Sequence, residues 1–239
     1  MTVSEPPVEL TMPNRAFLRR TAVVVGVLFI IATAFLFIGE FFYRPYLDAP
    51  DVLEIAAANK RAVVFGLLIE MICILAMPLI GAFIFPVLSK VSTGFALAYF
   101  FFRGLEAVVL ISVGLTNKFA ILSLSEAVAA GADRSAAELG LALIRSQNAW
   151  GNTDAPIYNI VFVCGAFCLY SVLFRARLIP RWISLWGLLA ITLHGGLVIL
   201  NAFAGTLPEW MFVLLFPIAV QEMVMAFWLI FRGFDPGHM

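Results

Sequence analysis

Five ionisable side chains of this sequence fall deep inside apolar stretches, where a charge needs a partner. Each lies roughly 10–15 residues from the end of its stretch, which at about 1.5 Å per residue is near the middle of a bilayer. In hydrocarbon an ionisable side chain costs on the order of a few kcal/mol unless it is paired, neutralised or hydrated. We therefore treat these five residues as candidates for binding a small solute or cation, or for handling a proton: Arg103, Glu106, Glu222, Glu70 and His194.

Arg103 and Glu106 form the firmest element of this set. They are three residues apart, so on a helix they share one face and reach each other or a common partner on a neighbouring helix. One interpretation is a buried ion pair that only fixes the helix orientation. If Glu70 and Glu222 also converge on Arg103, three carboxylates meet one guanidinium, and a proton, a cation or a water-filled cavity must offset the negative charge. The alternative is that these residues do not converge.

The other reactive residues of the apolar stretches favour packing over chemistry. His194 precedes Gly195 and Gly196, and we expect it to form an interhelical hydrogen bond rather than to bind a metal or transfer a proton. Cys164 and Cys168 are four residues apart on one helix face, which small-residue packing explains. The sequence contains no H-E-x-x-H, G-x-S-x-G, G-x-G-x-x-G or Walker motif. It therefore predicts no metal, no cofactor and no catalytic residue.

The composition places these candidates in a membrane. Of the 239 residues, 63% are hydrophobic and 13% are charged, and the mean hydropathy is +1.02. A soluble domain is about half apolar and about a quarter charged. Apolar runs of about 20 residues, the length that crosses the hydrocarbon core, occur six times. The predicted spans are 21–43, 62–87, 93–115, 157–175, 182–204 and 208–231.

These spans predict one all-α domain, a polytopic membrane helical bundle with six transmembrane helices over residues 21–233. A polar N-terminal tail, 1–20, precedes the bundle, and a short C-terminal tail, 234–239, follows it. The first apolar run is too long for the core of a cleaved signal peptide, and no small-residue cleavage site closes it, so we expect it to be retained as a span.

Two connections between the predicted spans are long enough to hold short helices. In the connection 44–61, Asp51 is placed to cap a helix that begins after it. In the connection 116–156, Ser135 and Glu138 form a capping-box pattern, S-x-x-E, which favours a helix over residues 135–148 on the outer face of the membrane.

The distribution of Lys and Arg predicts that both termini are cytoplasmic. These residues resist translocation, so they gather on the cytoplasmic side. Eight would lie on the side of the termini: Arg15, Arg19, Arg20, Lys90, Arg175, Arg177, Arg181 and Arg232. Six would lie on the other side: Arg44, Lys60, Arg61, Lys118, Arg134 and Arg145.

The net charge of the chain bears on whether it binds nucleic acid. Fifteen Lys and Arg balance fifteen Asp and Glu, so no basic surplus exists to hold a phosphate backbone. We expect no nucleic acid partner. Membrane lipids are the expected surroundings, together with a small solute, proton or cation if the buried residues form a site.

Three segments of the sequence resemble a known family. The segments FFRGLEAVVL, FRARLIPRWISLWGLLA and QEMVMAFWLIFRGF are similar to those of bacterial six-span membrane proteins grouped as domain of unknown function 4386. The resemblance covers almost the whole chain and implies an integral protein of the bacterial cytoplasmic (inner) membrane, but it implies no biochemical activity. The residues that match the family pattern are Arg103, Glu106, Pro180, Arg181, Trp182, Glu222, Trp228, Gly233 and Phe234.

Three functional hypotheses follow from the buried polar residues. The first is a membrane protein that handles a proton, cation or small solute at a midplane cluster of glutamates around Arg103. Six spans are few for a transporter that works as a monomer, and a homo-oligomer would answer that objection. The second is a structural or regulatory membrane subunit, in which the same residues only lock helix packing. The third and least favoured is an intramembrane enzyme that acts on a lipid, with Glu106 or Glu222 as general acid or base and His194 assisting.

Overall fold

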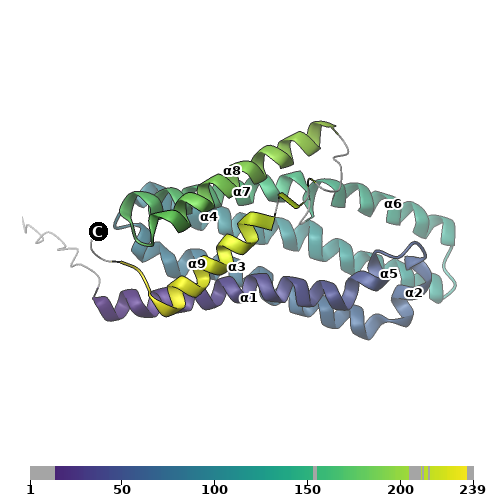
Figure 1. The fold of residues 1–239 in the computed structure, drawn as a ribbon. Coiled ribbons are helices and arrows are strands. Elements are labelled where there is room, and N and C mark those ends of the chain that lie inside the picture. The colour runs from purple at the N-terminus through teal and green to yellow at the C-terminus, as the bar shows by residue number, and fades with distance from the viewer. Residues whose placement is uncertain (1–13, 153–154, 205–210, 212, 215, 236–239) are drawn as a thin grey trace, which may run out of the picture.

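The computed structural model describes residues 14–152, 155–204, 211, 213–214 and 216–235, and within them all regular structure is helical (Figure 1). In chain order the elements are α1 (Arg15–Leu47), α2 (Val52–Ala58), α3 (Lys60–Leu88), α4 (Thr93–Val109), the π-helix η1 (Leu110–Leu115), α5 (Thr116–Ala129), α6 (Arg134–Gly151), α7 (Pro156–Ala176), α8 (Arg181–Ala204) and α9 (Phe216–Phe231).

The lengths and compositions of these helices are those of an integral membrane protein. Five helical stretches are long and apolar enough to cross a bilayer, and α9 is a shorter apolar helix. Large apolar side chains lie exposed on the outer surface, as lipid contact requires: Phe41 is 76% exposed and Phe231 is 73% exposed. The spanning stretches are Arg15–Leu47, Lys60–Leu88, Thr93–Ala129, Arg134–Ala176 and Arg181–Ala204.

Some predicted boundaries lie outside the described residues. The sixth predicted span, 208–231, contains α9, but residues 205–210, 212 and 215 are not described. The same holds for residues 1–13 of the predicted N-terminal tail and for 236–239 of the predicted C-terminal tail.

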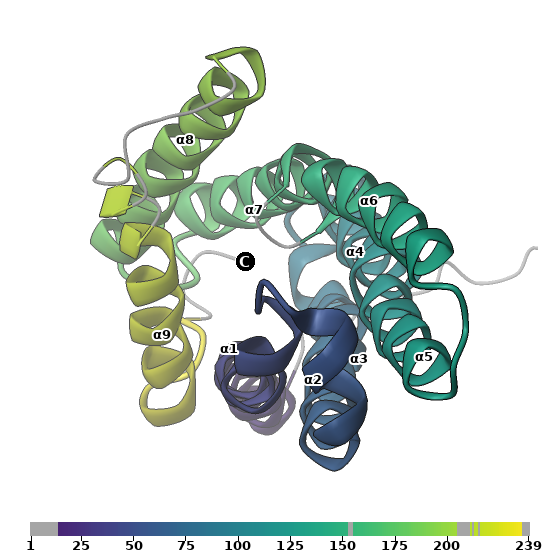
Figure 2. The same cartoon turned by 90° about the vertical axis from the view of Figure 1, so that its right-hand side faces the viewer.

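The helices form one elongated bundle (Figures 1 and 2). Helix α1 packs along α3 and α9, α4 contacts both α3 and α7, and α7 contacts α8. Helix α1 begins where α9 ends, because the Arg19 guanidinium donates hydrogen bonds to the carbonyl oxygens of Leu229, at 3.1 Å, and Ile230, at 2.6 Å. Helices α2 and α5 and much of α6 lie together at the opposite end (Figure 2).

A pair of glycines brings α1 and α3 into close contact. A methyl group added at Gly39 would lie 2.8 Å from the carbonyl oxygen of Gly66, and one added at Gly66 would lie 2.7 Å from that of Gly39. Small residues at a crossing let two backbones approach in lipid, where packing is the main attraction between helices. This crossing places Glu70, one turn after Gly66, directly against α1.

The buried apolar side chains form two clusters. One cluster gathers around Phe29, Tyr99 and Tyr170 near the end that holds the termini. The other gathers around Tyr43 and Leu110 toward the opposite end. Helix α4 contributes to both clusters, so its middle residues lie at the junction, which is where the candidate site is found.

The third predicted span, 93–115, lies within a longer helix. Residues Thr93–Ala129 run continuously through α4, η1 and α5, whereas the sequence predicts a connection from residue 116. In η1 the backbone takes the wider π form, in which the Thr116 N–H bonds to the carbonyl oxygen of Ile111, five residues earlier. The polar residues after position 115 therefore belong to the bundle rather than to a surface loop.

Candidate functional site

The centre of the site is the pair that Arg103 and Glu106 form on α4. The Arg103 Nη1 atom donates to Glu106 Oε2 at 2.6 Å, and both side chains are buried. Each nevertheless keeps an atom without a hydrogen bond, because neither Arg103 Nε nor Glu106 Oε1 has a partner among the residues that the structure describes. A buried polar atom without a partner is rare and costs about 1–3 kcal/mol. The pair thus retains one donor and one acceptor for a further group.

Three other helices close around this pair. Phe29 of α1 presents its ring to the Arg103 guanidinium, whose Cζ lies 5.8 Å from the ring centroid. A methyl group added at Gly81 of α3 would lie 3.4 Å from the Arg103 Cβ. One added at Gly165 of α7 would lie 3.4 Å from the unpartnered Glu106 Oε1. The absence of a side chain at Gly165 therefore leaves the Glu106 carboxylate room on the α7 side.

Glu222 brings a second carboxylate to Arg103 from α9. Its charge interacts with the Arg103 guanidinium, and it makes no ion pair or hydrogen bond with any residue that the structure describes. The preceding residue fixes this part of α9, because Gln221 donates from Nε2 to the Ile183 carbonyl oxygen at 3.0 Å and accepts from the Tyr170 hydroxyl at 2.6 Å. Glu222 is therefore held near Arg103 by its neighbour rather than by a bond of its own.

Glu70 forms a separate buried pair. Lys118 Nζ donates to both Glu70 carboxylate oxygens, at 2.6 Å and 2.9 Å, and both side chains are buried. The Lys118 ammonium also lies 4.7 Å from the centroid of the Tyr43 ring. Glu70 is thus neutralised by Lys118 and not by Arg103.

The π-helix accounts for the position of Lys118. Lys118 follows Glu106 by twelve residues, and in a regular α-helix this spacing places the two side chains about 120° apart around the axis. Lys118 would then point away from the face that carries Glu106. A π segment holds one more residue in its turn than an α-helix does. This reduces the angle between the two side chains by about 100° and leaves about 20°. Lys118 consequently returns to the inward face, about 18 Å along the helix axis from Glu106.

His194 forms a third polar contact, between α8 and α7. Its Nε2 atom lies 2.7 Å from Asn159 Oδ1, and the Asn159 Nδ2 atom donates to the Ala155 carbonyl oxygen at 2.9 Å. Because Asn159 Oδ1 is an acceptor, the proton of the neutral imidazole lies on Nε2. The buried Nδ1 atom has no partner. The structure shows the interhelical hydrogen bond expected of His194 and gives it no contact with Arg103, Glu106 or Glu222.

Three side chains of these contacts were not among the candidates taken from the sequence. They are Lys118, its neighbour Tyr43, and Asn159. Lys118 follows the predicted third span, so it resembled a loop residue, and only a π-helix brings it inward. Asn159 lies near the start of an apolar run, where an amide needs no special explanation. Within the described part of the chain, no three His, Cys, Asp or Glu side chains are grouped as a metal site requires.

Comparison with known proteins identifies the family of the chain. Neither the curated proteins nor the solved structures contain a match to it. The model of one family, described as a domain of unknown function (DUF4386), matches residues 24–233. This range holds both buried ion pairs, Glu222 and the His194–Asn159 contact. The chain therefore belongs to the DUF4386 family, as its third span, its Ile-Pro-Arg-Trp turn and its last span predicted.

Proposed function

We propose that the protein handles a proton or a small monovalent cation at the cluster of Arg103, Glu106 and Glu222, within the cytoplasmic membrane of a bacterium. The observation that carries the proposal is the charge of this cluster. One guanidinium faces two carboxylates, so the fully ionised cluster has one surplus negative charge in an apolar interior. A single positive charge restores neutrality.

The hydrogen-bonding capacity of the cluster supports the same conclusion. Glu106 Oε1 is a buried acceptor without a partner. Glu222 supplies further carboxylate oxygens from the opposite helix. Carboxylate oxygens are the ligands of hard cations and the acceptors of protons, and such residues mark ion and proton pathways in membrane proteins. The positive charge of Arg103 makes the potential at the cluster less negative, which weakens the binding of a positive ligand and so favours its release.

The Glu70–Lys118 ion pair is not part of the proposed site. Glu70 and Lys118 carry opposite charges and bond to each other through both carboxylate oxygens. This pair has no net charge, so it offers no surplus negative charge to attract a cation. It stabilises the bundle near the proposed site and takes no part in uptake.

Cation binding is tested by thermal unfolding of the purified protein in neutral detergent. Na⁺, K⁺ and Li⁺ are added in turn, with choline chloride holding the ionic strength constant. A ligand that binds only the folded state raises the unfolding temperature as its concentration exceeds its Kd. We expect one of these ions to raise it in the wild type and not in Glu222→Gln. Glu54→Gln, which changes an exposed carboxylate, should respond as the wild type does.

Proton handling is tested in proteoliposomes that contain a pH-sensitive dye and carry an imposed membrane potential. We expect a proton or cation flux that Glu222→Gln abolishes and Glu54→Gln preserves. Glu222 makes no ion pair, so its substitution should leave the unfolding temperature close to that of the wild type. If the wild type shows neither cation stabilisation nor flux, the proposal is wrong. If Glu222→Gln instead mainly lowers stability, the cluster is a packing element of a structural subunit.

A further inference from the structure

A pocket at the end of the bundle where α1 begins and α9 ends has a strongly positive lining. It has a volume of about 570 Å³ and is formed by the turn between α7 and α8 and by the segment after α9. Three arginines from separate segments line it, namely Arg177, Arg181 and Arg232. The pocket shares no lining residue with the Arg103 cluster. The inference drawn from it does not depend on the proposed function.

The arginines of this pocket are available to a ligand. None of the three forms an ion pair with a carboxylate in the part of the chain that the structure describes. Asp235 also lines the pocket, so the lining carries three positive charges and one negative charge. Three guanidiniums around one hollow repel one another unless an anion lies between them. The surplus of two positive charges matches a phosphate group, which carries about −1.5 to −2 charges at neutral pH when it is a monoester.

The backbone around the pocket is fixed. The Asp235 N–H donates to the Leu178 carbonyl oxygen at 2.8 Å, which ties the segment after α9 to the turn before α8. Arg177 ends α7 in the left-handed conformation, with φ of 52°, which residues other than glycine adopt only rarely. Phe234 is buried beside these residues. The arginines therefore project from a preformed frame rather than from a mobile tail.

A second pocket of similar size provides a comparison within the same molecule. It has a volume of about 520 Å³ and lies at the opposite end, where Arg134 and Arg145 are balanced by Asp51 and Glu138. Arg134 bonds to Glu138 at 3.0 Å and also to a glutamate of α2. The charges of this second pocket therefore sum to zero. Of these two pockets in the described part of the chain, the one lined by Arg177, Arg181 and Arg232 has the positive surplus.

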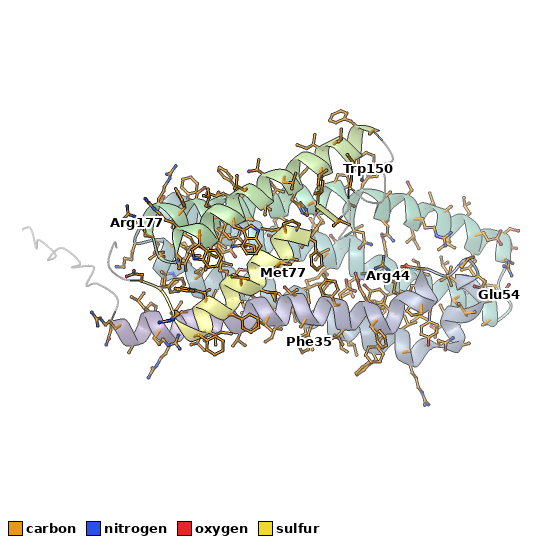
Figure 3. All side chains as sticks on the ribbon, in the orientation of Figure 1. Phe35, Arg44, Glu54, Met77, Trp150 and Arg177 are labelled. Carbon is orange, nitrogen blue, oxygen red and sulfur yellow. The ribbon has the colours of Figure 1, made fainter. Side chains whose placement is uncertain are left out.

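The position of the pocket indicates where the phosphate would come from. Trp228 lines it, and tryptophans gather at the level of lipid headgroups. Phe231, one turn along α9, is 73% exposed on the outer surface of the bundle. Arg177 lies at the end of the bundle opposite to Glu54 (Figure 3). We infer that the pocket binds the phosphate monoester group of an anionic phospholipid, of which phosphatidic acid is the example, at the membrane surface on the side where α1 begins and α9 ends.

The inference is tested by calorimetric titration of the full-length protein in neutral detergent. The probes are short-chain phosphatidic acid, short-chain phosphatidylcholine and inorganic phosphate. We expect phosphatidic acid to bind and phosphatidylcholine not to bind. Inorganic phosphate at least tenfold weaker than phosphatidic acid would identify a lipid as the source, whereas equal binding would identify a soluble phosphate. If neither phosphatidic acid nor inorganic phosphate binds to the wild type, the inference is overturned.

Variants locate the binding. Each guanidinium near the ligand contributes about fivefold to affinity, so the triple variant Arg177→Gln, Arg181→Gln, Arg232→Gln should bind phosphatidic acid about 100-fold more weakly. The control Arg134→Gln, Arg145→Gln, in the balanced pocket, should bind as the wild type does. If the triple variant is unfolded, the single Arg177→Gln variant serves with an expected loss of about fivefold. Equal losses in the control and in the pocket variants would also overturn the inference.

Discussion

The Glu70–Lys118 pair allows a direct measurement of what a buried charge costs this bundle. We predict that Glu70→Gln lowers the free energy of unfolding by about 3–5 kcal/mol, because it leaves the Lys118 ammonium buried without a counter-charge. The side chain of Lys118 is 8% exposed and that of Glu70 is 1% exposed, so water cannot replace the lost carboxylate. The Tyr43 ring, 4.7 Å from the ammonium, compensates for only part of the loss.

A second ion pair of equal length is the matched control. Lys60 Nζ lies 2.6 Å from Glu126 Oε1, the same distance as the shorter contact of the buried pair, but its side chains are 57% and 39% exposed. Glu126→Gln should therefore cost only about 0.2–1 kcal/mol. The double variant Glu70→Gln, Lys118→Met removes both buried charges, so it should recover most of the stability lost in Glu70→Gln.

Reversible unfolding in mixed micelles, followed by tryptophan fluorescence, gives these free energies. The comparison has three parts: the buried single variant, the exposed single variant and the double variant. Equal losses in Glu70→Gln and Glu126→Gln would show that burial does not determine the cost of breaking the pair. A double variant less stable than Glu70→Gln would show that Lys118 contributes through packing rather than through charge. Either result would refute the reasoning.

Two further predictions concern the backbone that positions these residues. Gly39→Ala places a methyl group 2.8 Å from a backbone oxygen of α3, so it should lower the unfolding temperature measured in a thermal scan. Gly196→Ala adds its methyl group in open space, so in the same scan the unfolding temperature should stay unchanged or rise. Deletion of Ser112, an exposed residue of η1, should remove the extra residue of the π segment and return the helix to the α form, with the lysine still about 20° from Glu106 on the inward face that meets Glu70. The deletion should therefore cost much less stability than Glu70→Gln, and a loss as large as that of Glu70→Gln would contradict this account of the π-helix.

The sequence was sufficient to predict the class of fold and the family. Long apolar runs have one stable form in lipid, since a helix satisfies its own backbone hydrogen bonds. Local signals also succeeded: α2 begins after Asp51, and α6 covers the predicted stretch 135–148. The capping details differ, because Asp133 rather than Ser135 caps α6 and the Asp51 side chain makes no cap hydrogen bond.

The candidate site could be predicted only as far as local spacing reaches. Arg103 and Glu106 are three residues apart, so their contact follows from helix geometry alone. Which carboxylate meets which cation across helices depends on the axial positions of α3, α4 and α9, and no spacing in the sequence encodes these. The π-helix adds a change of phase that a regular helical pattern does not contain. Glu70 was therefore a correct candidate for a buried charge, but its partner Lys118 was placed in a connection.

The two buried ion pairs differ in whether their polar atoms all have hydrogen-bond partners, and this difference indicates different roles. In the Glu70–Lys118 pair both carboxylate oxygens are bonded to the ammonium, and the charges cancel. In the Arg103–Glu106 pair one oxygen and one nitrogen remain without partners, although both residues are buried. A bundle that needed only a structural lock would gain stability by closing the second pair as it closes the first. It instead has Glu222 near the open pair and leaves Gly165 beside the Glu106 oxygen that lacks a described partner, which supports the proposal that this cluster takes up a positive charge.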